Sequence, residues 1–477
     1  MARKLIEKGK PHKAFRLMKS YGKDHPDDFN TAWLYAKTAY LANRISVSGK
    51  QYRKAIRLSP GNLYARLDYA DYLVNTGRFE QAQGNLDAYL AYDKGNYKAL
   101  VLKSKIDYWQ SDYKAANQKL DKIPGEYSGE PDVTRLRNDI NLAESPWLGI
   151  NGNFFADNQP LQCYNLSASA GLFLHPHASP YIRLAEPLFD ADGVYQLASW
   201  IQVGNRSVFA KPGMNLDLSL GFIKFPSANT YSWSGSAELS KTFFYHLPVS
   251  LTVCQNPYFS TLGSIDARVF EDHITLTAGW DRQTSWYGQA TVDYSFYPID
   301  NSGIYSGNGW VFAPPVSLAP FTFRVGYGFA YSNADVNHFV AEKTVDEIIS
   351  DYSTTTEIKG VYVPYFTPRN QQVHSLLIGI QIHPGKVIRI GLNANFGLMA
   401  MADIPYLFLD KDANGTVFIN KGYSYQHYTP IEATGKIAFR ISNTVNLEAD
   451  YTFSSTYFYI RNYTDIGLKI RFADGRK

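Results

Sequence analysis

Hydrophobic and polar residues alternate with a period of two along the second part of this chain. The pattern is clearest in the closing stretch, residues 463–472, whose apolar positions are Ile466, Leu468, Ile470 and Phe472. A β-strand with this period has one apolar face and one polar face. The same alternation recurs at 231–239, 274–281 and 445–453.

Charged residues among the polar positions indicate whether the apolar faces pack in a protein core or face lipid. A core between two packed sheets does not accept unpaired charges. An apolar band that faces lipid, around a hydrated interior, accepts them. The pattern therefore predicts an antiparallel transmembrane β-barrel over residues 148–472, followed by a tail, residues 473–477. At about 20 residues for a strand with its turn, this length holds about sixteen strands.

The strands are expected to begin near residues 148, 163, 180, 195, 215, 231, 248, 260, 273, 286, 321, 371, 386, 431, 444 and 460. An even strand number returns the chain to the side on which it enters the barrel. If that side is the periplasm, the short turns 383–386 and 442–444 face it, and the long loops 333–370 and 400–429 face the exterior. The connection 298–320 does not fit, because it is long and yet faces the periplasm. Either the strand number is off by two, or this segment folds inward.

The first part of the chain, residues 1–125, repeats with a period of about 34 residues. Positions in register are Ala14, Ser48, Ala82 and Ala116; Ala36, Ala70 and Ser104; Met18, Tyr52, Leu86 and Leu120; Ile45, Phe79 and Tyr113. This pattern resembles the tetratricopeptide repeat, in which small residues lie where paired helices cross closely. It predicts an α-solenoid over 1–125, then a capping helix and linker over 126–147. The first repeat is incomplete, so we expect a signal sequence and further repeats upstream of Met1.

Three aromatic residues are candidates for a binding groove on the solenoid: Trp33, Tyr40 and Tyr108. Tyr40 and Tyr108 occupy the same position of the repeat, and Trp33 lies on the same expected helix as Tyr40. One interpretation is that they meet a polymer or a partner protein in the concave groove. The other is that they pack between helices.

Composition supports a barrel and argues against nucleic acid. The chain has 36 Tyr, 28 Phe and 8 Trp, and only 19% of its residues are charged. Aromatic residues at this density suit strands and the interfacial girdles of a barrel. The net charge of +4 is small for 477 residues, and no basic run stands out, so we expect no nucleic-acid partner. The two cysteines, Cys163 and Cys254, either pair or stay free.

The sequence shows no arrangement typical of a catalytic or metal site. It has no phosphate-binding loop, paired carboxylates or Ser/His/Asp set at a recognisable spacing. His175 and His177 have no carboxylate or cysteine at ligand spacing. We expect no enzymatic activity, no cofactor and no metal.

The predicted inner face of the barrel carries many charged residues. They are Asp217, Glu238, Asp266, Arg268, Asp281, Asp293, Arg324, Arg389, Lys436, Arg440, Glu448, Asp450, Lys469 and Arg471. Either they line a hydrated conduit for a polar polymer, or they form a network of opposed charges that braces the wall. Acidic residues dominate the earlier strands and basic residues several later ones, which predicts an electric field across the lumen.

The final strand resembles the C-terminal signal that the bacterial barrel insertion machinery reads. Gly467, Ile470 and Phe472 stand at the glycine and the two hydrophobic positions of that signal, while residues 473–477 are a departure from it. The resemblance implies insertion into the bacterial outer membrane, with lipid and the insertion machinery as partners.

A loop motif adds a resemblance to a family. Residues 321–332 form an expected strand, a loop with Tyr365-Phe366-Thr367-Pro368 follows, and another strand starts near Ser375. This order resembles the barrel of the cellulose synthase operon protein C family, in which such a loop bears a Gly-Tyr-Phe-Ser-Pro-Gln type motif. Pro364 replaces the glycine and Arg369 the glutamine. Upstream tetratricopeptide repeats with about sixteen strands are the architecture of that family and of the related poly-N-acetylglucosamine export porin.

The resemblance implies an outer-membrane porin that exports an extracellular polysaccharide. Its repeats would lie in the periplasm and dock the polymer, or polysaccharide-modifying or synthase proteins. Without the family, Tyr365 and Phe366 either stack on sugar rings or pack a loop against the barrel rim. Two other functions stay open: a protein translocator resembling the surface lipoprotein assembly modulators, and a barrel scaffold without transport.

Overall fold

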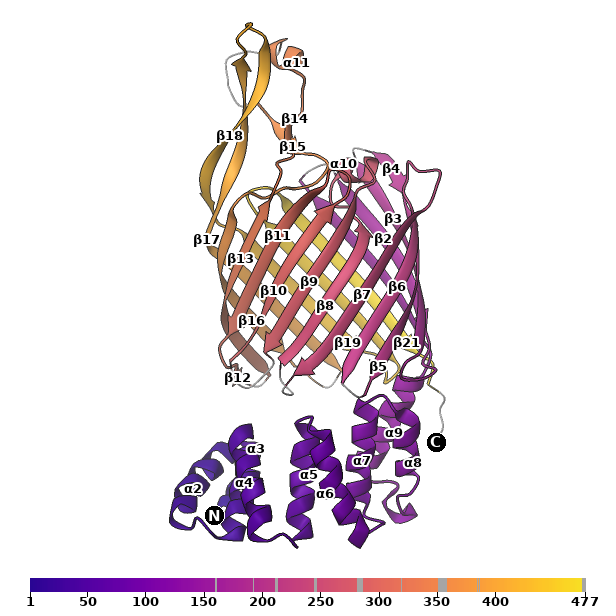
Figure 1. Cartoon of the computed structure of the whole chain (residues 1–477), viewed down its shortest axis with the longest axis vertical. Coiled ribbons are helices and arrows are strands. Elements are labelled where there is room, and N and C mark those ends of the chain that lie inside the picture. The colour runs from indigo at the N-terminus through magenta and orange to yellow at the C-terminus, as the bar shows by residue number, and fades with distance from the viewer. Residues whose placement is uncertain are drawn as a thin grey trace. The chain divides into compact units, whose positions relative to one another are not determined.

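The computed structural model describes residues 1–158, 161–191, 193–210, 213–243, 247–280, 286–318, 320–350, 358–383, 385 and 387–473. The chain divides into two compact units, Met1–Glu144 and Ser145–Lys477. The first unit is helical and the second is a β-barrel (Figure 1).

The first unit is a series of paired helices. They are α1 (Ala2–Glu7), α2 (Pro11–Asp24), α3 (Phe29–Leu41), α4 (Ile45–Leu58), α5 (Leu63–Asn75), α6 (Phe79–Tyr92), α7 (Tyr97–Trp109), α8 (Tyr113–Leu120) and α9 (Pro131–Glu144). Helix α3 packs on α4, α5 on α6, and α7 on α8. Within the described part of the chain, no helix is both long enough and apolar enough to cross a membrane.

Local chemistry explains the repeat. Helices α3, α5 and α7 start after Asp28, Asn62 and Asn96, and each of these side chains accepts a hydrogen bond from the backbone N–H three residues later. Such a cap stabilises a helix by about 1 kcal/mol. The turns inside successive repeats share a residue with positive φ: Gly9, Asn43, Gly77 and Ser111. The small residues predicted at helix crossings are fully buried: Ala14, Ala36, Ser48, Ala70, Ala82, Ser104 and Ala116. The predicted tetratricopeptide-like repeat is confirmed.

The second unit is one antiparallel sheet that closes on itself. The strands that close it are β1 (Trp147–Asp157), β2 (Gln162–Gly171), β3 (Ser179–Ala191), β5 (Ser199–Phe209), β6 (Met214–Lys224), β7 (Ser232–Phe243), β8 (Leu247–Pro257), β9 (Phe270–Trp280), β10 (Tyr287–Tyr297), β11 (Ser302–Phe312), β13 (Phe321–Ala334), β16 (Gln371–Ile382), β17 (Ile388–Lys411), β19 (Ile431–Arg440), β20 (Val445–Ser455) and β21 (Ile460–Arg471). Strand β21 pairs with β1 along its length and closes the barrel. Three further strands pair with members of this set: β4 (Val194–Leu197), β12 (Val316–Leu318) and β18 (Val417–Tyr428). The predicted barrel of sixteen strands is confirmed. We call the end that carries Trp147 and Arg471 the terminal end, and the opposite end the loop end.

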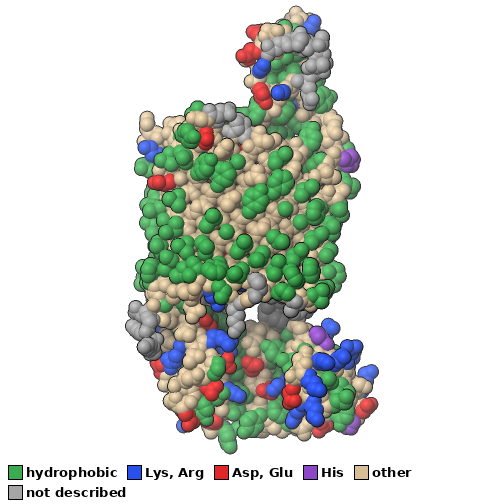
Figure 2. Space-filling model, turned by 180° about the vertical axis from the view of Figure 1, so that it is seen from behind, with side chains coloured by type: hydrophobic (Ala, Val, Ile, Leu, Met, Phe, Trp, Pro, Cys, Tyr) green, Lys and Arg blue, Asp and Glu red, His purple; other side chains and the backbone are tan. Residues whose placement is uncertain are grey.

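Strand alternation places apolar side chains on the outside of the barrel. Along β6, Leu218 and Leu220 are 45% and 50% exposed, whereas Ile223, on the opposite face, is fully buried. Figure 2 shows hydrophobic side chains spread over the outer surface, with charged ones rare between its two rims. An outer apolar band around a barrel with an even number of strands is typical of the bacterial outer membrane.

Two strand predictions were wrong, and their errors cancel in the strand number. No strand begins near 260, because Thr261 and Ser264 form a capping box that starts the short helix α10 (Leu262–Asp266). The connection 298–320, which did not fit the predicted topology, contains the missed strand β11. Three glycines in β11 lower its strand propensity and hide its alternation.

The two long segments expected as loops at the loop end differ in structure. Between β13 and β16 the chain forms β14 (Phe339–Ala341), α11 (Val345–Ser350) and β15 (Gly360–Tyr362). The segment 400–429 is not a loop, because β17 continues to Lys411 and pairs with β18 in a hairpin that rises past the loop end (Figure 1).

The two cysteines are free thiols. Cys163 is buried near the loop end against Phe189 and Leu161, and Cys254 is half-buried on β8. Of the two alternatives that the sequence left open, the structure therefore shows unpaired thiols.

Candidate functional site

The inner face of the barrel carries most of the charged residues singled out in the sequence. Those on the strand face opposite the exposed apolar rows are Asp217, Glu238, Asp293, Arg324, Arg389, Lys436, Arg440, Glu448, Asp450, Lys469 and Arg471. Asp281 lies outside the described residues. Asp217 and Glu238 are direct cross-strand partners, as are Lys436 and Asp450. The inner wall is polar and charged, as a hydrated interior requires.

Asp266 and Arg268 do not lie on a strand, so their assignment to the inner wall was wrong. Asp266 ends helix α10, which forms where the strand near 260 was expected. Arg268 follows with φ 56° and donates a hydrogen bond to the backbone oxygen of Ser227 at 2.6 Å. Both residues belong to the segment that covers the loop end.

Some of the inner-face charges pair within the wall. Arg206 Nε lies 2.8 Å from Asp217, and Lys436 Nζ lies 3.2 Å from Asp450 and 3.5 Å from Glu448. These side chains are partly exposed, so each pair contributes at most about 1 kcal/mol to stability. The bracing interpretation accounts for these pairs but not for the cations that have no such partner.

The described charges separate along the barrel axis. Near the terminal end the inner face carries Arg183, Arg206, Arg324, Arg389, Lys436, Arg440, Lys469 and Arg471, against Asp217, Glu238, Glu448 and Asp450. Toward the loop end it carries Asp157, Glu271, Asp293 and Glu432, against Arg461. This separation runs along the axis, and the field predicted across the lumen stays a prediction. Antiparallel strands reverse direction at every turn, so order along the chain does not report height in the barrel.

The sequence analysis missed Arg183 and Arg206. The alternation that predicts the other inner-face residues could have found Arg183, because it stands between the outward-facing Ile182 and Leu184. Arg206 is the cross-strand partner of Asp217. A strand expected from about 195 spans β4 and the start of β5, so its register obscured Arg206.

The loop motif begins with Tyr365, which inserts into the loop end of the barrel. Tyr365 is 0% exposed and stacks on Tyr297 of β10 with ring centroids 3.7 Å apart. Its hydroxyl group lies 2.8 Å from Asp300 Oδ2 and 3.1 Å from His338 Nε2. Although burial raises the pKa of Asp300, hydrogen bonds from Tyr365 and Ser302 bring that pKa below its ordinary value. A ring in this position packs the loop and is not available to a sugar.

The rest of the motif ties the loop to itself and to strand β13. Thr367 is 1% exposed, and its hydroxyl group accepts a hydrogen bond from the backbone N–H of His338 at 2.9 Å. The backbone oxygen of Pro368 accepts one from Ala334 N–H at 2.7 Å. These bonds hold the motif against the end of β13.

Other contacts extend around the mouth of the barrel. Phe366 packs on Phe458, in the turn between β20 and β21, with ring centroids 4.6 Å apart. The guanidinium group of Arg369 lies 3.9 Å from the ring centroid of Tyr423 on β18. On the β8–β9 side, the Thr261 hydroxyl group donates to the backbone oxygen of residue 364. The described part of the loop therefore contacts several parts of the rim.

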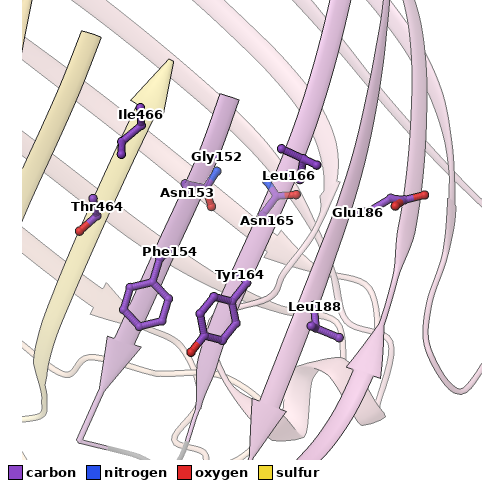
Figure 3. Close-up of a pocket in the computed structure, with 10 residues that line it drawn as sticks. All are labelled: Gly152, Asn153, Phe154, Tyr164, Asn165, Leu166, Glu186, Leu188, Thr464 and Ile466. Carbon is purple, nitrogen blue, oxygen red and sulfur yellow. The ribbon is translucent and has the colours of Figure 1, made fainter. Parts of the chain in front are cut away.

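A shallow groove of about 430 Å³ lies on the outer face of β21, β1, β2 and β3 (Figure 3). It is lined by Gly152, Asn153, Phe154, Tyr164, Asn165, Leu166, Glu186, Leu188, Thr464 and Ile466. Glu186 is a cross-strand partner of Leu166 and shares its outer face. Because the groove opens to the outside, it is not part of an inner path.

The three solenoid aromatics lie between helices. Trp33 Nε1 donates a hydrogen bond to Asp68 Oδ2 at 2.9 Å. Tyr40 stands edge-on to Tyr72 at 5.7 Å between ring centroids. These two residues and Tyr108 are partly buried and pack against the cores of the helical unit. Packing accounts for their contacts.

The residues of the insertion signal lie at the seam between β1 and β21. Gly467 pairs with Asn151, and Ile470 pairs with Leu148 on the outer face. Phe472 is 57% exposed, and its backbone N–H donates to the oxygen of Pro146 at 2.8 Å. An exposed aromatic at the rim matches the interfacial girdle of membrane barrels.

No family model and no curated protein matches this chain. Among solved structures, it is similar to a bacterial polysaccharide outer membrane secretin, with a TM-score of 0.48 and 9% identity, covering 69% of this chain and 99% of that one. It is also similar to Salmonella typhi OmpF in complex with daunomycin, with a TM-score of 0.34 and 10% identity, covering 69% and 97%. The helical unit is similar to a tetratricopeptide repeat protein from Parabacteroides merdae, with a TM-score of 0.27 and 14% identity, covering 30% and 56%. These likenesses concern architecture and assign no substrate. The chain is an outer-membrane β-barrel with an N-terminal tetratricopeptide-like helical region.

Proposed function

We propose that this protein is a passive conduit that exports an extracellular polysaccharide across the bacterial outer membrane. The observation that carries the proposal is a closed barrel with a charged, hydrated inner wall, joined in one chain to a solenoid of helical repeats. A polar polymer that passes such a wall exchanges water for many weak polar contacts, and tight binding at any one of them would stall it.

The direction of transport follows from the strand topology. The helical repeats precede β1, whose first residue, Trp147, lies at the terminal end. Short turns of bacterial barrels face the periplasm and longer loops face the exterior. The repeats would then lie in the periplasm, where solenoids commonly offer extended surfaces to partners. We assign them the docking of the polymer or of polysaccharide-modifying and synthase proteins.

The contacts of the loop motif fit a gated exit. Tyr365, Phe366 and Arg369, which follow β15, contact the rim at the mouth of the barrel. A polymer leaving the barrel would displace this loop. Displacement is feasible because aromatic stacking and hydrogen bonds, not covalent bonds, hold the loop in place. No cofactor is required, because synthesis of the polymer at the inner membrane would push it outward.

The test is removal of the gene from its native strain, followed by complementation with the full chain. Loss of secreted polysaccharide, its retention in the periplasm and its return on complementation are the expected results. Unchanged polysaccharide together with loss of a surface lipoprotein would replace export by protein translocation. Unchanged polysaccharide and unchanged surface proteins would leave a scaffold without transport.

A further inference from the structure

Three cation–aromatic pairs stand around the inner wall near the terminal end. The distances from cation to ring centroid are 4.9 Å for Lys469 and Trp147, 5.0 Å for Arg206 and Tyr181, and 5.3 Å for Arg324 and Tyr287. The pairs come from β21 and β1, from β5 and β3, and from β13 and β10. The first two pairs lie within five consecutive strands, β21, β1, β2, β3 and β5, and the third lies on another part of the wall, on β10 and β13. We call these six residues the collar.

The rings of the collar have fixed places on the wall. A Cβ atom on Gly171 would lie 2.7 Å from the Trp147 ring, and one on Gly204 would lie 2.3 Å from the Tyr181 ring. Each of these rings therefore lies flat on a glycine of the neighbouring strand, where any side chain would displace it. Tyr287 is held by stacking on Phe312, with ring centroids 5.3 Å apart. Fixed rings keep their cations in place and reduce the entropy that binding would cost.

Most cations at this end have no carboxylate partner. In the described part of the chain, Arg206 and Lys436 form ion pairs there, whereas these do not: Arg183, Arg324, Arg389, Arg440 and Lys469. Arg324 Nη2 donates to Gln381 at 3.2 Å, but its buried Nε has no hydrogen-bond partner. The terminal end therefore offers positive charge and hydrogen-bond donors that the wall itself does not satisfy.

The loop end contrasts with this arrangement. Asp157 lies 2.9 Å from Arg461, and Asp300 lies 2.6 Å from His338. Both of these carboxylates have a cationic partner within the protein.

The helical unit carries the same sign of charge on two helices. Helix α4 contains Lys50, Arg53, Lys54 and Arg57 and no acidic residue. Helix α2 contains Lys13, Arg16, Lys19 and Lys23 against a single acid, Asp24. Helices α2 and α4 thus each carry an excess of positive charge.

We propose that the collar binds an acidic polysaccharide, one whose sugar rings carry carboxylate groups. This inference rests on the proposed export function and names its substrate class. Guanidinium groups bind carboxylates through paired hydrogen bonds, and the apolar faces of sugar rings pack on aromatic rings. An excess of positive charge near the terminal end also concentrates negative charge at that entrance. The collar is the site at which the polymer enters the barrel.

Binding of oligosaccharides to the purified full chain in detergent tests this inference. Three probes of equal length are titrated by calorimetry: oligogalacturonate, its neutral methyl ester, and a cationic chitosan oligomer. We expect oligogalacturonate to bind, its affinity to fall as salt rises, and the other two not to bind. Equal binding of the methyl ester, or preferred binding of the chitosan oligomer, would overturn the acidic class.

Substitutions place the binding at the collar. The double variant R324Q/K469Q should bind oligogalacturonate about a hundredfold more weakly, because it loses two charged hydrogen bonds and each contributes about tenfold to the affinity. The matched control is K241Q: Lys241 is also a cation beside an aromatic ring, Phe243, near the terminal end, but on the outer face of β7. Unchanged affinity in the control is expected, and an equal loss there would refute the collar. If the double variant does not assemble, as judged by its gel migration without heating, R324Q and K469Q are measured singly.

The outcome separates this inference from the export function. In one outcome, the strain needs this protein to secrete polysaccharide, but the purified chain does not bind oligogalacturonate. The export function would then stand, and the collar would be refuted as a binding site. In the other outcome, oligogalacturonate binds at the collar, but loss of the protein leaves secretion of all polysaccharide unchanged. The collar would then stand as a binding site, and the export function would be refuted.

Discussion

At the scale of single residues, Tyr365 is the anchor of the loop that covers the barrel mouth. Its ring stacks on Tyr297 and its hydroxyl group meets Asp300 and His338. Truncation of a fully buried aromatic side chain costs about 3–5 kcal/mol. This one side chain therefore has a large share in holding the loop against the barrel rim.

The first prediction concerns Tyr365. Replacement by Ala (Y365A) should release the loop and raise single-channel conductance in planar bilayers, whereas Y365F keeps the stack, loses the hydroxyl contacts and should raise conductance less. Tyr457 is 53% exposed in the turn between β20 and β21, so Y457A is the matched control and should behave like the parent chain. Equal conductance in Y365A and the parent would show that the loop does not close the path.

The second prediction concerns acid. The pKa of Asp300 lies below its ordinary value of 3.8, since the hydrogen bonds it accepts outweigh burial. A carboxyl group with a depressed pKa stabilises the closed loop above the ordinary pKa, and that contribution is lost as pH falls through the depressed pKa. Conductance should therefore be constant from neutral pH to about pH 5 and rise below about pH 4. In D300N that rise should be absent, and a rise of equal size in D300N would assign it to another group.

Alternation predicts the face on which a residue lies, but not its height. The inner-face positions of Arg324, Lys436 and Lys469 follow from the apolar neighbours on either side. To predict that all three lie near the terminal end, one must know where every strand begins and ends and in which direction it runs. Contacts between strands that do not pair directly, such as Arg324 on β13 with Tyr287 on β10, have no signal in a single sequence. The collar therefore could not be predicted from the sequence alone.

At the scale of elements, the seam between β1 and β21 determines whether the barrel exists. The two strands pair continuously from Trp147 with Arg471 to Asp157 with Arg461. A sheet without this seam has two long unpaired edges, which membrane lipid cannot satisfy.

The third prediction tests the seam. Deletion of residues 468–477 removes the last paired residues of β21 and the exposed Phe472, so the protein should stay unassembled and migrate alike with and without heating. Deletion of residues 474–477 alone leaves all of β21 and is the control, with normal assembly. Normal surface exposure after the longer deletion would contradict an essential seam.

Element prediction from sequence succeeds where local chemistry is strong. The repeat helices carry caps and positive-φ turns at fixed spacing, so their pattern survives without any knowledge of packing. Strand β11 has glycines in place of alternating apolar residues, and its register is set by pairing with β10 and β13. Helix α10 shows the converse, since a local capping box overrides an apparent alternation of polar residues.

At the scale of the whole molecule, two units that fold around separate cores share one chain. Residues on each side of the boundary belong to different compact units, and the helical unit has its own buried clusters. A unit with its own core is expected to fold without the other. The barrel should therefore assemble without the repeats, which allows delivery and passage to be separated experimentally.

The fourth prediction uses this separation. A variant that retains a signal sequence but lacks residues 1–144 should insert into the outer membrane and show the same heat-dependent gel shift as the full chain. Secretion of the polysaccharide should nevertheless fall strongly, because a passive barrel depends on the local concentration of polymer at its entrance, and tethered binding modules raise such a concentration by mass action. Supplying the helical unit in trans should restore little, since the effective concentration provided by the covalent link is lost. If the barrel alone secretes the polymer at the parent rate, the repeats have no part in delivery.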